Sequence, residues 1–309
     1  MMKIGVQTGG IQEEYGVDGA YRIIREVGFD AADANIDQLF SPEAIRSKSV
    51  STAFAGGEKD FLENVRPWRD AARKYHVTNY QAHAPFPSLL YQEEAYSDYL
   101  IEVLKKVIAC CDYIDCRNLI IHPFFYPSEH RLPLEQEFEM NIERYSRLIP
   151  AARNYGVTIC LENMFTGYNG KQFCSCCGDP LEACRYVDAL NGAAGTACFG
   201  FCLDTGHALL GGQEILRTMR ILGDRICAFH VHDNNGISDQ HLAPYWGVMD
   251  WGRFARGLAD IGYEKTMCFE TFMAWNRVDP ALRKAVLQYI YQAGRVFSEK
   301  AEALKREGD

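Results

Sequence analysis

Short apolar runs recur along the whole chain, and most of them stop at a polar side chain. Six of them are NYQAH, NLIIH, TICLEN, FGFCLDTGH, RICAFHVHDN and TMCFE. Runs rich in β-branched and aromatic residues are typical of strands in a parallel sheet that is buried on both faces. The stretches between them are long enough for amphipathic helices, for example at 97–116, 134–155, 180–190 and 251–262. The pattern therefore predicts strands that alternate with helices.

Eight strands are expected when the whole chain is read in this way. Their predicted positions are 3–8, 31–36, 79–83, 118–122, 158–162, 199–204, 225–230 and 265–270. Eight strands that alternate with eight helices indicate an α/β fold, a closed (β/α)8 TIM barrel. A length of 309 residues suits one such barrel with modest loop insertions, so a single domain over residues 1–309 is predicted.

Potential metal ligands lie at or shortly after the carboxyl ends of these predicted strands. In a TIM barrel these ends converge on one face, where residues far apart in sequence meet. A lone histidine or carboxylate at a strand end is more often structural or solvated, but buried Asp and Glu are rare unless they are paired or bound to metal. Groups of this kind at six strand ends together predict a metal site. The nine candidates are His83, His122, Glu162, Asp204, His207, His230, Asp239, His241 and Glu270.

The core of the predicted site is Glu162, Asp204, His230 and Glu270. Three carboxylates and one imidazole suit a divalent ion such as Mn, Mg, Co or Zn. His207 follows Asp204 by three residues, and the intervening Gly206 allows a sharp turn. The other candidates, His83, His122, His207, Asp239 and His241, are expected to bind substrate or an additional metal. For His83 and His122, a core histidine bonded to the backbone stays open as an alternative.

Five motifs give the chain a family resemblance: LEN at 161–163, LDTGH at 203–207, HVHDN at 230–234, DQHLAPYWGVMDW at 239–251 and FE at 269–270. Together they resemble the xylose isomerase-like barrel superfamily. This group includes sugar isomerases and epimerases, inosose dehydratases and abasic-site nucleases of the endonuclease IV type. The resemblance covers nearly the full chain.

The ketose epimerases of this superfamily imply a mechanism. The resemblance places a metal ion on Glu162, Asp204, His230 and Glu270, with Glu162 and Glu270 as the catalytic acid and base on opposite sides of a bound sugar. One carboxylate would remove the proton next to the carbonyl, the other would return one, and the metal would stabilise the enediolate. The expected partner is a small-molecule sugar or polyol.

Two departures from the epimerase pattern leave the reaction open. The arginine usual six residues after the metal-binding histidine is here Gly236, and the usual PGEG turn is PYWG, with Tyr245 and Trp246. Aromatic faces commonly stack on rings of ligands, so Trp246, Phe124 and Phe165 are predicted to form part of the pocket wall, although packing of the PYWG aromatics on the rim is the alternative. Further aromatic residues follow strand ends and indicate a partly aromatic cavity: Phe86, Tyr126, Tyr168 and Trp275.

Other functions are weighed against the epimerase reading. All nine ligands match the trinuclear zinc pattern of endonuclease IV, which makes a metal-dependent phosphodiesterase acting on abasic DNA an alternative. Two observations argue against it. The chain has 32 Lys and Arg and 41 Asp and Glu, which gives a formal net charge of −9, and the loops 167–179 and 232–247 together contain one lysine. Nucleic acid is therefore not the expected partner. A lyase or dehydratase acting on an oxidised sugar or inosose, and a non-catalytic assembly subunit, also stay open.

The cysteines and the search for targeting or membrane segments add little to the predicted chemistry. Cys160, Cys198, Cys202, Cys227 and Cys268 are predicted to be small buried side chains in strands. Cys174, Cys176 and Cys177 form a C-x-C-C cluster that is either a soft-metal or redox site or a set of adventitious thiols. The sequence shows no secretory signal and no transmembrane candidate, so a cytoplasmic protein is expected. Residues 37–59 are interpreted as a lid or as a dimer contact of a homo-oligomer.

Overall fold

The barrel strands lie close to the predicted positions. The computed structural model describes residues 1–40, 42–47 and 57–308. Its main sheet contains eight parallel strands in the order β10-β1-β2-β3-β4-β5-β8-β9. Their bounds are β1 (Lys3–Gln7), β2 (Ala31–Ala34), β3 (Thr78–His83), β4 (Asn118–Ile121), β5 (Thr158–Glu162), β8 (Phe199–Asp204), β9 (Ile226–His230) and β10 (Thr266–Phe269).

The sheet curls round so that its two edge strands meet. Val231, just after β9, donates its N–H to the Cys268 carbonyl at 2.9 Å and accepts from the Glu270 N–H at 3.1 Å. Val231 also forms a parallel bridge with Phe269. These contacts bring β9 against β10, and the predicted α/β TIM barrel is confirmed.

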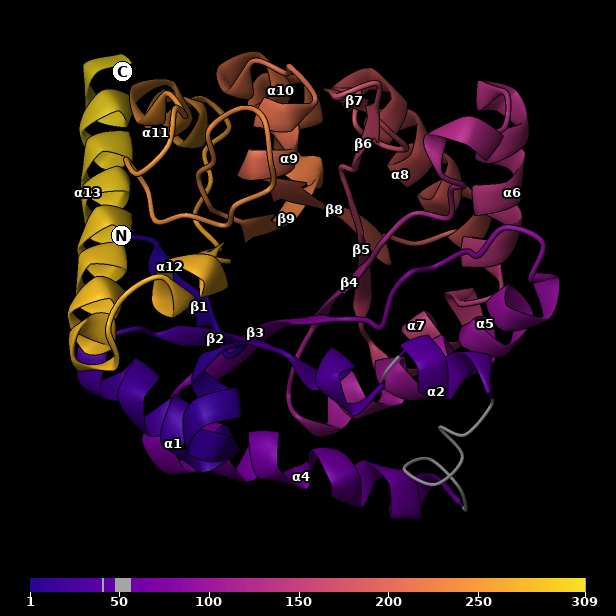
Figure 1. Cartoon of the computed structure of the whole chain (residues 1–309), viewed down its shortest axis with the longest axis horizontal. Coiled ribbons are helices and arrows are strands. Elements are labelled where there is room, and N and C mark those ends of the chain that lie inside the picture. Colours follow the sequence, from indigo (N-terminus) through magenta and orange to yellow (C-terminus); the bar gives the residue numbers. More distant parts are fainter. Residues whose placement is uncertain (41, 48–56, 309) are drawn as a thin grey trace.

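Helices surround the strands (Figure 1). Their bounds are α1 (Ile11–Val27), α2 (Pro42–Arg46), α4 (Glu58–Tyr75), α5 (Glu94–Tyr113), α6 (Leu134–Ser146), α7 (Ile149–Tyr155), α8 (Pro180–Ala194), α9 (Thr205–Leu210), α10 (Ile215–Leu222), α11 (Trp251–Asp260), α12 (Phe272–Asn276) and α13 (Arg283–Gly308). Short 3-10 turns are η1 (Ile36–Leu39), η2 (Ser128–His130), η3 (Gly223–Arg225) and η4 (Pro280–Leu282). No helix in the described part of the chain is long and apolar enough to cross a bilayer.

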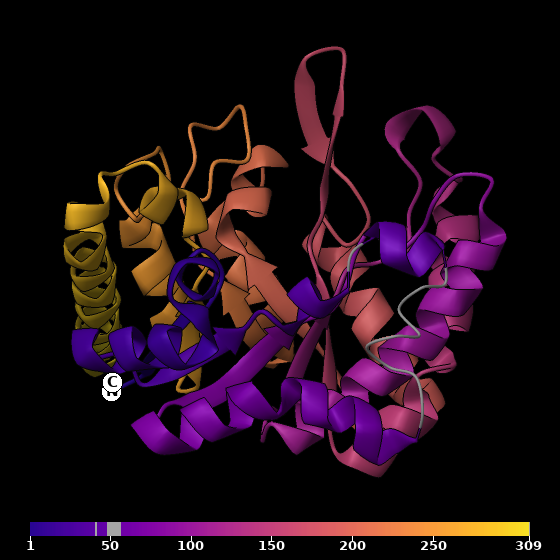
Figure 2. The same cartoon turned by 60° about the horizontal axis from the view of Figure 1, so that its bottom comes forward.

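One local prediction was wrong, and one local element was not predicted. The single helix expected over 134–155 is two helices, α6 and α7, because Pro150 lies in the first turn of α7 and cannot donate the hydrogen bond that a continuous helix would need. The loop after β5, for which no strands were predicted, contains an antiparallel hairpin of β6 (Phe165–Tyr168) and β7 (Lys171–Cys174). Figure 2 shows this hairpin rising above the barrel.

The core has an outer and an inner part, on the two faces of the sheet. Outside the barrel, Phe229 packs edge-on against Phe254 and Tyr263. A smaller cluster of buried residues comes from four neighbouring strands, and it consists of Ile120, Cys160, Cys202, Cys227 and Ala228. The five cysteines predicted to be small buried strand residues are all buried, but Cys198 lies one residue before β8. Part of the segment interpreted as a lid or dimer contact, residues 41 and 48–56, lies outside the described residues, and that interpretation stays a prediction.

Candidate active site

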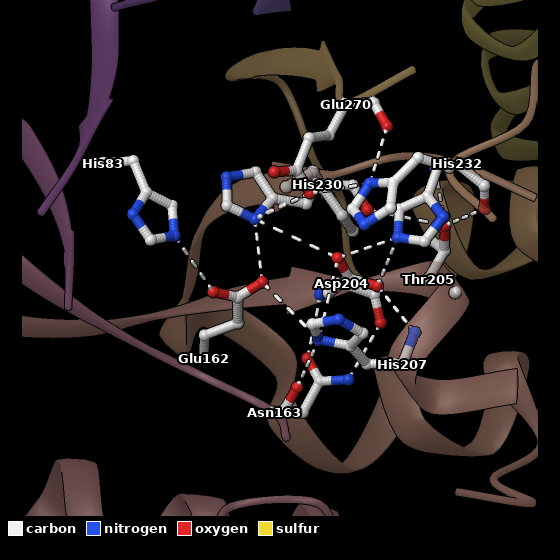
Figure 3. A network of polar contacts seen from close by, with 12 residues as sticks. His83, Glu162, Asn163, Asp204, Thr205, His207, His230, His232 and Glu270 are labelled. Atoms are coloured by element: carbon white, nitrogen blue, oxygen red, sulfur yellow. Dashed lines mark hydrogen bonds and ion pairs between the residues drawn. The ribbon is translucent and has the colours of Figure 1, made fainter. Parts of the chain in front are cut away.

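A cavity of about 780 Å³ opens at the carboxyl ends of the barrel strands. His83 ends β3, Glu162 ends β5, Asp204 ends β8 and His230 ends β9. The side chains at these ends converge although the residues are far apart in sequence (Figure 3). Seven of the nine predicted residues line the cavity: His83, His122, Glu162, His207, Asp239, His241 and Glu270. The other two, Asp204 and His230, are fully buried.

The four residues predicted as the core of the site lie together. His230 Nδ1 is 2.8 Å from Glu162 Oε1, 3.5 Å from Glu270 Oε2 and 4.0 Å from Asp204 Oδ2. One ligand atom from each of the four residues lies within 4.8 Å of all the others. The other imidazole nitrogen, Nε2, is 3.2 Å from Asp33 Oδ2, which fixes the ring plane. The barrel therefore assembles one oxygen-rich group around a single imidazole.

A second group of ligand atoms shares Glu162 with the first. His122 Nε2 lies 3.1 Å from Glu162 Oε2, and His83 Nε2 lies 3.8 Å from the same oxygen. The two Nε2 atoms are 3.1 Å apart. Nδ1 of His83 is 2.7 Å from the Ala84 carbonyl, and this contact orients the ring. His83 is thus bonded to the backbone, as the alternative proposed, but its Nε2 still faces the cavity. Glu162 thus stands between two clusters.

A third group lies beside the core and comes from α9 and the loop after β9. His241 Nε2 is 2.9 Å from Asp239 Oδ2, and His207 Nε2 is 3.6 Å from the same oxygen. His232 Nε2 lies 3.9 Å from Asp239 Oδ1. The structure thus brings His207, Asp239 and His241 together as sequence analysis expected, and it adds His232 to them.

Burial and neighbouring charges shift the pKa values of Glu162 and His83 in opposite directions. Burial alone would raise the pKa of Glu162, but His230, His122 and His83 outweigh it and hold this pKa well below its usual value. Burial raises the pKa of Glu270 to about 7, and nearby carboxylates add to the shift. Burial would lower the pKa of His83, but the carboxylate of Glu162 raises it to about 9. The carboxylates thus hold protons on imidazoles, and a divalent cation bound here would displace them.

Two buried carboxylate oxygens support the fit of a divalent ion. Asp239 Oδ1 accepts no hydrogen bond, and neither does Glu162 Oε2, because His122 Nε2, 3.1 Å away, is not aligned for one. A buried oxygen without a donor is costly, and a bound cation would remove that cost. Carboxylate oxygens and imidazole nitrogens are also donors that Mn, Mg, Co and Zn accept, in differing proportions. The residues present therefore fit a divalent ion.

His232 was not predicted from the sequence. This residue is fully buried, its Nε2 lies 3.0 Å from the Asp204 carboxylate, and its ring stacks on that of His241 at 4.0 Å. A Cβ at Gly206 would clash with the His232 ring, so glycine is required there for packing as well as for the turn. The signal was present in HVHDN, because residues two apart on an extended chain lie on the same face. Asp33, the second-last residue of β2, contacts His230 and was also not predicted as part of the site.

Replacing His232 with alanine is expected to weaken binding of Mn²⁺ or Zn²⁺ by about 10- to 100-fold, because Asp204 loses the partner that orients its carboxylate. Competition with a chromophoric chelator measures this directly. His130→Ala, at an exposed histidine on η2, is the control and should leave the affinity unchanged. Equal affinities in the His232→Ala variant and the parent protein would refute the role of His232.

The predicted pocket wall is only partly correct. Phe165 lines the cavity, whereas Phe124 and Trp246 do not. Phe124 is fully buried against Tyr145, and the adjacent Phe125 faces the cavity instead, because neighbouring residues of an extended segment point in opposite directions. Trp246 lies on the rim near Tyr289, as the packing alternative anticipated. Phe86 lines the cavity, but three further aromatic residues of the prediction lie outside its lining: Tyr126, Tyr168 and Trp275.

The C-x-C-C cluster lies beside the hairpin and away from the cavity lining. Cys174 is partly exposed at the end of β7, while Cys176 and Cys177 are buried. Cys176 Sγ and one carboxylate oxygen each of Glu137 and Glu182 lie within 4.8 Å of one another. Glu137 is already paired with Arg131 at 2.6 Å. A soft-metal or redox role for these thiols stays a prediction.

Comparisons with known proteins agree with this architecture. An uncharacterized protein of Methanocaldococcus jannaschii, MJ1311, is 27% identical over 214 residues, 67% of this chain and 69% of that protein. A D-tagatose 3-epimerase-like protein matches at a TM-score of 0.70 and 19% identity, with all of both chains covered. The IOLI protein with a binding zinc atom matches at 0.68 and 16%, covering 97% of this chain and 98% of that one. At these identities the two solved structures show the fold alone.

A family model, unlike these pairwise matches, shows to which family the chain belongs. The model described as xylose isomerase-like TIM barrel matches residues 21–293. All nine predicted ligands, from His83 to Glu270, lie within this range. This match spans most of the chain. The chain therefore belongs to the xylose isomerase-like TIM barrel family.

Proposed function

We propose that this protein is a metal-dependent isomerase or epimerase that acts on a ketose or a related polyol. The observation that carries the proposal is the placement of Glu162 and Glu270 in one cluster with His230 and Asp204. Two carboxylates that face one cavity can serve as base and acid in a proton transfer next to a carbonyl group. The fold shared with a D-tagatose 3-epimerase-like protein supports this reaction class.

The two glutamates have environments that suit opposite roles. Glu162, surrounded by imidazoles that lower its pKa, stays ionised and can accept a proton from carbon. Glu270, whose pKa burial raises to about 7, can hold a proton near neutral pH and return it to the enediolate. For the reverse reaction the roles exchange. Groups whose environments separate their pKa values in this way are typical acid and base partners.

Glu162, Asp204, His230 and Glu270 are proposed to hold the divalent ion. When bound, the ion would polarise the substrate carbonyl and stabilise negative charge on its oxygens as the adjacent C–H bond breaks. Asp33 would keep the His230 ring in position, and Asn163 would do the same for Asp204, since its side chain bonds both the N–H and the carbonyl of that residue at 2.8 Å. The IOLI protein, with its zinc atom, supports a metal in this fold.

Phosphodiester hydrolysis is the second candidate, because three adjacent ligand groups could hold three metal ions. The cavity argues against it: no lysine or arginine is found among the described residues that line it. A phosphate backbone would therefore meet few of the basic side chains that normally supply affinity.

Two measurements on the purified protein distinguish these functions. The isomerase predicts about one Mn, Co, Mg or Zn per chain by elemental analysis and uptake of deuterium from D₂O into a ketose from a panel of free ketoses and keto-inositols. The nuclease predicts about three zinc ions per chain and cleavage of abasic DNA. Absence of deuterium uptake from metal-loaded protein with every member of the panel and with keto-glycosides would reject the isomerase proposal.

A further inference from the structure

Beyond the polar clusters, the cavity wall is largely aromatic and apolar. Four phenylalanines line it, and each comes from a different segment on the carboxyl-end face of the barrel. Phe86 follows β3, Phe125 follows β4, Phe165 begins β6 and Phe272 begins α12. Leucine, methionine and proline side chains fill the wall between them, for example Leu89 and Met164. A free sugar, which is polar on most of its surface, would leave such a wall without a matching partner.

This apolar wall begins where the ligand groups end. The Phe86 ring lies 5.0 Å from that of His122 and 5.4 Å from that of His83. Phe165 lies 5.0 Å from His207, and Phe272 lies 4.4 Å from His241. A molecule whose reacting carbons reach Glu162 and Glu270 would therefore extend directly between these rings.

The charges of the lining select against an anionic substrate. Its described residues include Glu13 and Asp37 in addition to the carboxylates of the ligand groups, and among them there is no lysine or arginine. A sugar phosphate or sugar acid would bring further negative charge to this wall without a cationic side chain to pair with it, apart from histidines that already face carboxylates.

The volume also exceeds what one sugar ring fills. A cavity of about 780 Å³ is in the range, roughly 300–1,000 Å³, of sites that enclose drug-sized ligands. Phe86 is 46% exposed, so an apolar side chain at this wall is left facing water. A flat apolar group on the substrate would cover it and leave the sugar in contact with the carboxylates.

From the wall, the charge and the volume together, we infer that the substrate is an uncharged keto sugar that carries an aromatic group, such as an aryl keto-glycoside. The sugar ring lies against Glu162 and Glu270, and the aromatic group lies between Phe86, Phe125 and Phe272. This inference rests on the proposed function, because it assigns the inner end of the cavity to a sugar.

Binding of matched glycosides to metal-loaded protein tests the inference. The probes are phenyl and methyl pyranosides in the gluco, galacto and manno configurations, with glucose 6-phosphate as an anionic probe, measured by calorimetry. Burial of a phenyl group predicts that at least one phenyl glycoside binds about 10- to 100-fold more tightly than its methyl partner. If no phenyl member binds more tightly than its partner, or if glucose 6-phosphate binds most tightly, the inference is overturned.

Two variants show whether the aromatic wall causes the preference for phenyl over methyl glycosides. Phe86→Ala should remove most of the phenyl preference and leave the affinity for the methyl glycoside within about twofold, and Phe125→Ala is a second variant from another loop. The matched control is Phe173→Ala, because Phe173 on β7 is 47% exposed and does not line the cavity. A phenyl preference that persists in both wall variants would place the aromatic group elsewhere and contradict the inference.

Failure of the inference differs from failure of the proposed function. Deuterium uptake by a free ketose without any phenyl preference would retain the isomerase and reject the aryl substrate. A phenyl preference without deuterium uptake into any ketose or aryl keto-glycoside would support the aromatic subsite and reject proton-transfer chemistry. Both readouts come from the same preparation, whose metal content is measured beforehand.

Discussion

Exchanging Glu162 for glutamine should lower turnover of the proposed isomerase by about 1,000-fold and remove most of the bound metal. Glu162 belongs both to the ligand group with His83 and His122 and to the group with Asp204, His230 and Glu270. Its replacement deprives both groups of a charge and the reaction of a base. Elemental analysis and steady-state kinetics with the active ketose measure the two losses.

Two further variants separate the two roles of Glu162. His83→Ala alters only the group farther from Glu270, so it should leave the metal of the core group in place. Glu270→Gln should reduce turnover by a similar factor to Glu162→Gln and retain more metal, since it belongs to one group only. Full metal content together with full turnover in Glu162→Gln would show that neither role is correct.

Replacing Arg131 with methionine should lower the free energy of unfolding by about 3–5 kcal/mol. Arg131 donates to both carboxylate oxygens of Glu137, at 2.6 and 2.9 Å, and Glu137 is fully buried at the start of α6. Without the guanidinium, a buried carboxylate would stay unpaired next to Glu182, whose pKa burial already raises to about 7. Urea unfolding monitored by circular dichroism gives the difference.

The same helix supplies the control for this prediction. Glu135, two residues before Glu137, forms an equally short pair of hydrogen bonds with Arg185, at 2.7 and 2.6 Å, but both side chains are exposed. Arg185→Met should therefore cost much less stability than Arg131→Met, even with the loss of its contact with the Phe138 ring. If the two variants lost equal stability, burial would not be the cause.

The fold and most of the candidate site could be predicted from local sequence patterns. The strand over Thr78–His83 was expected at 79–83, and the other barrel strands end within two residues of their predicted ends. In a parallel barrel all carboxyl ends lie on one face, so the strand ends sufficed to predict that Glu162, Asp204 and His230 meet. Their convergence did not depend on loop conformation.

Residues beyond the strand ends were less predictable. His232 follows His230 in the sequence, yet its contact with Asp204 requires the close approach that Gly206 permits. Phe124, and not Phe125, is buried. The Asn141 side chain on α6 bonds the N–H and the carbonyl of Phe124 at 2.8 and 2.7 Å, and so fixes the direction of the chain there.

The sequence by itself determined the barrel and most of the polar residues at the carboxyl-end face, because strand periodicity and the parallel arrangement are short-range and topological properties. Only the tertiary structure decided which aromatic side chains form the wall of the cavity, which carboxylates lie together around His230 and which are paired with arginine. These choices depend on contacts between segments that are distant along the chain, such as Asn141 with Phe124, and no local pattern encodes the direction in which a loop side chain points.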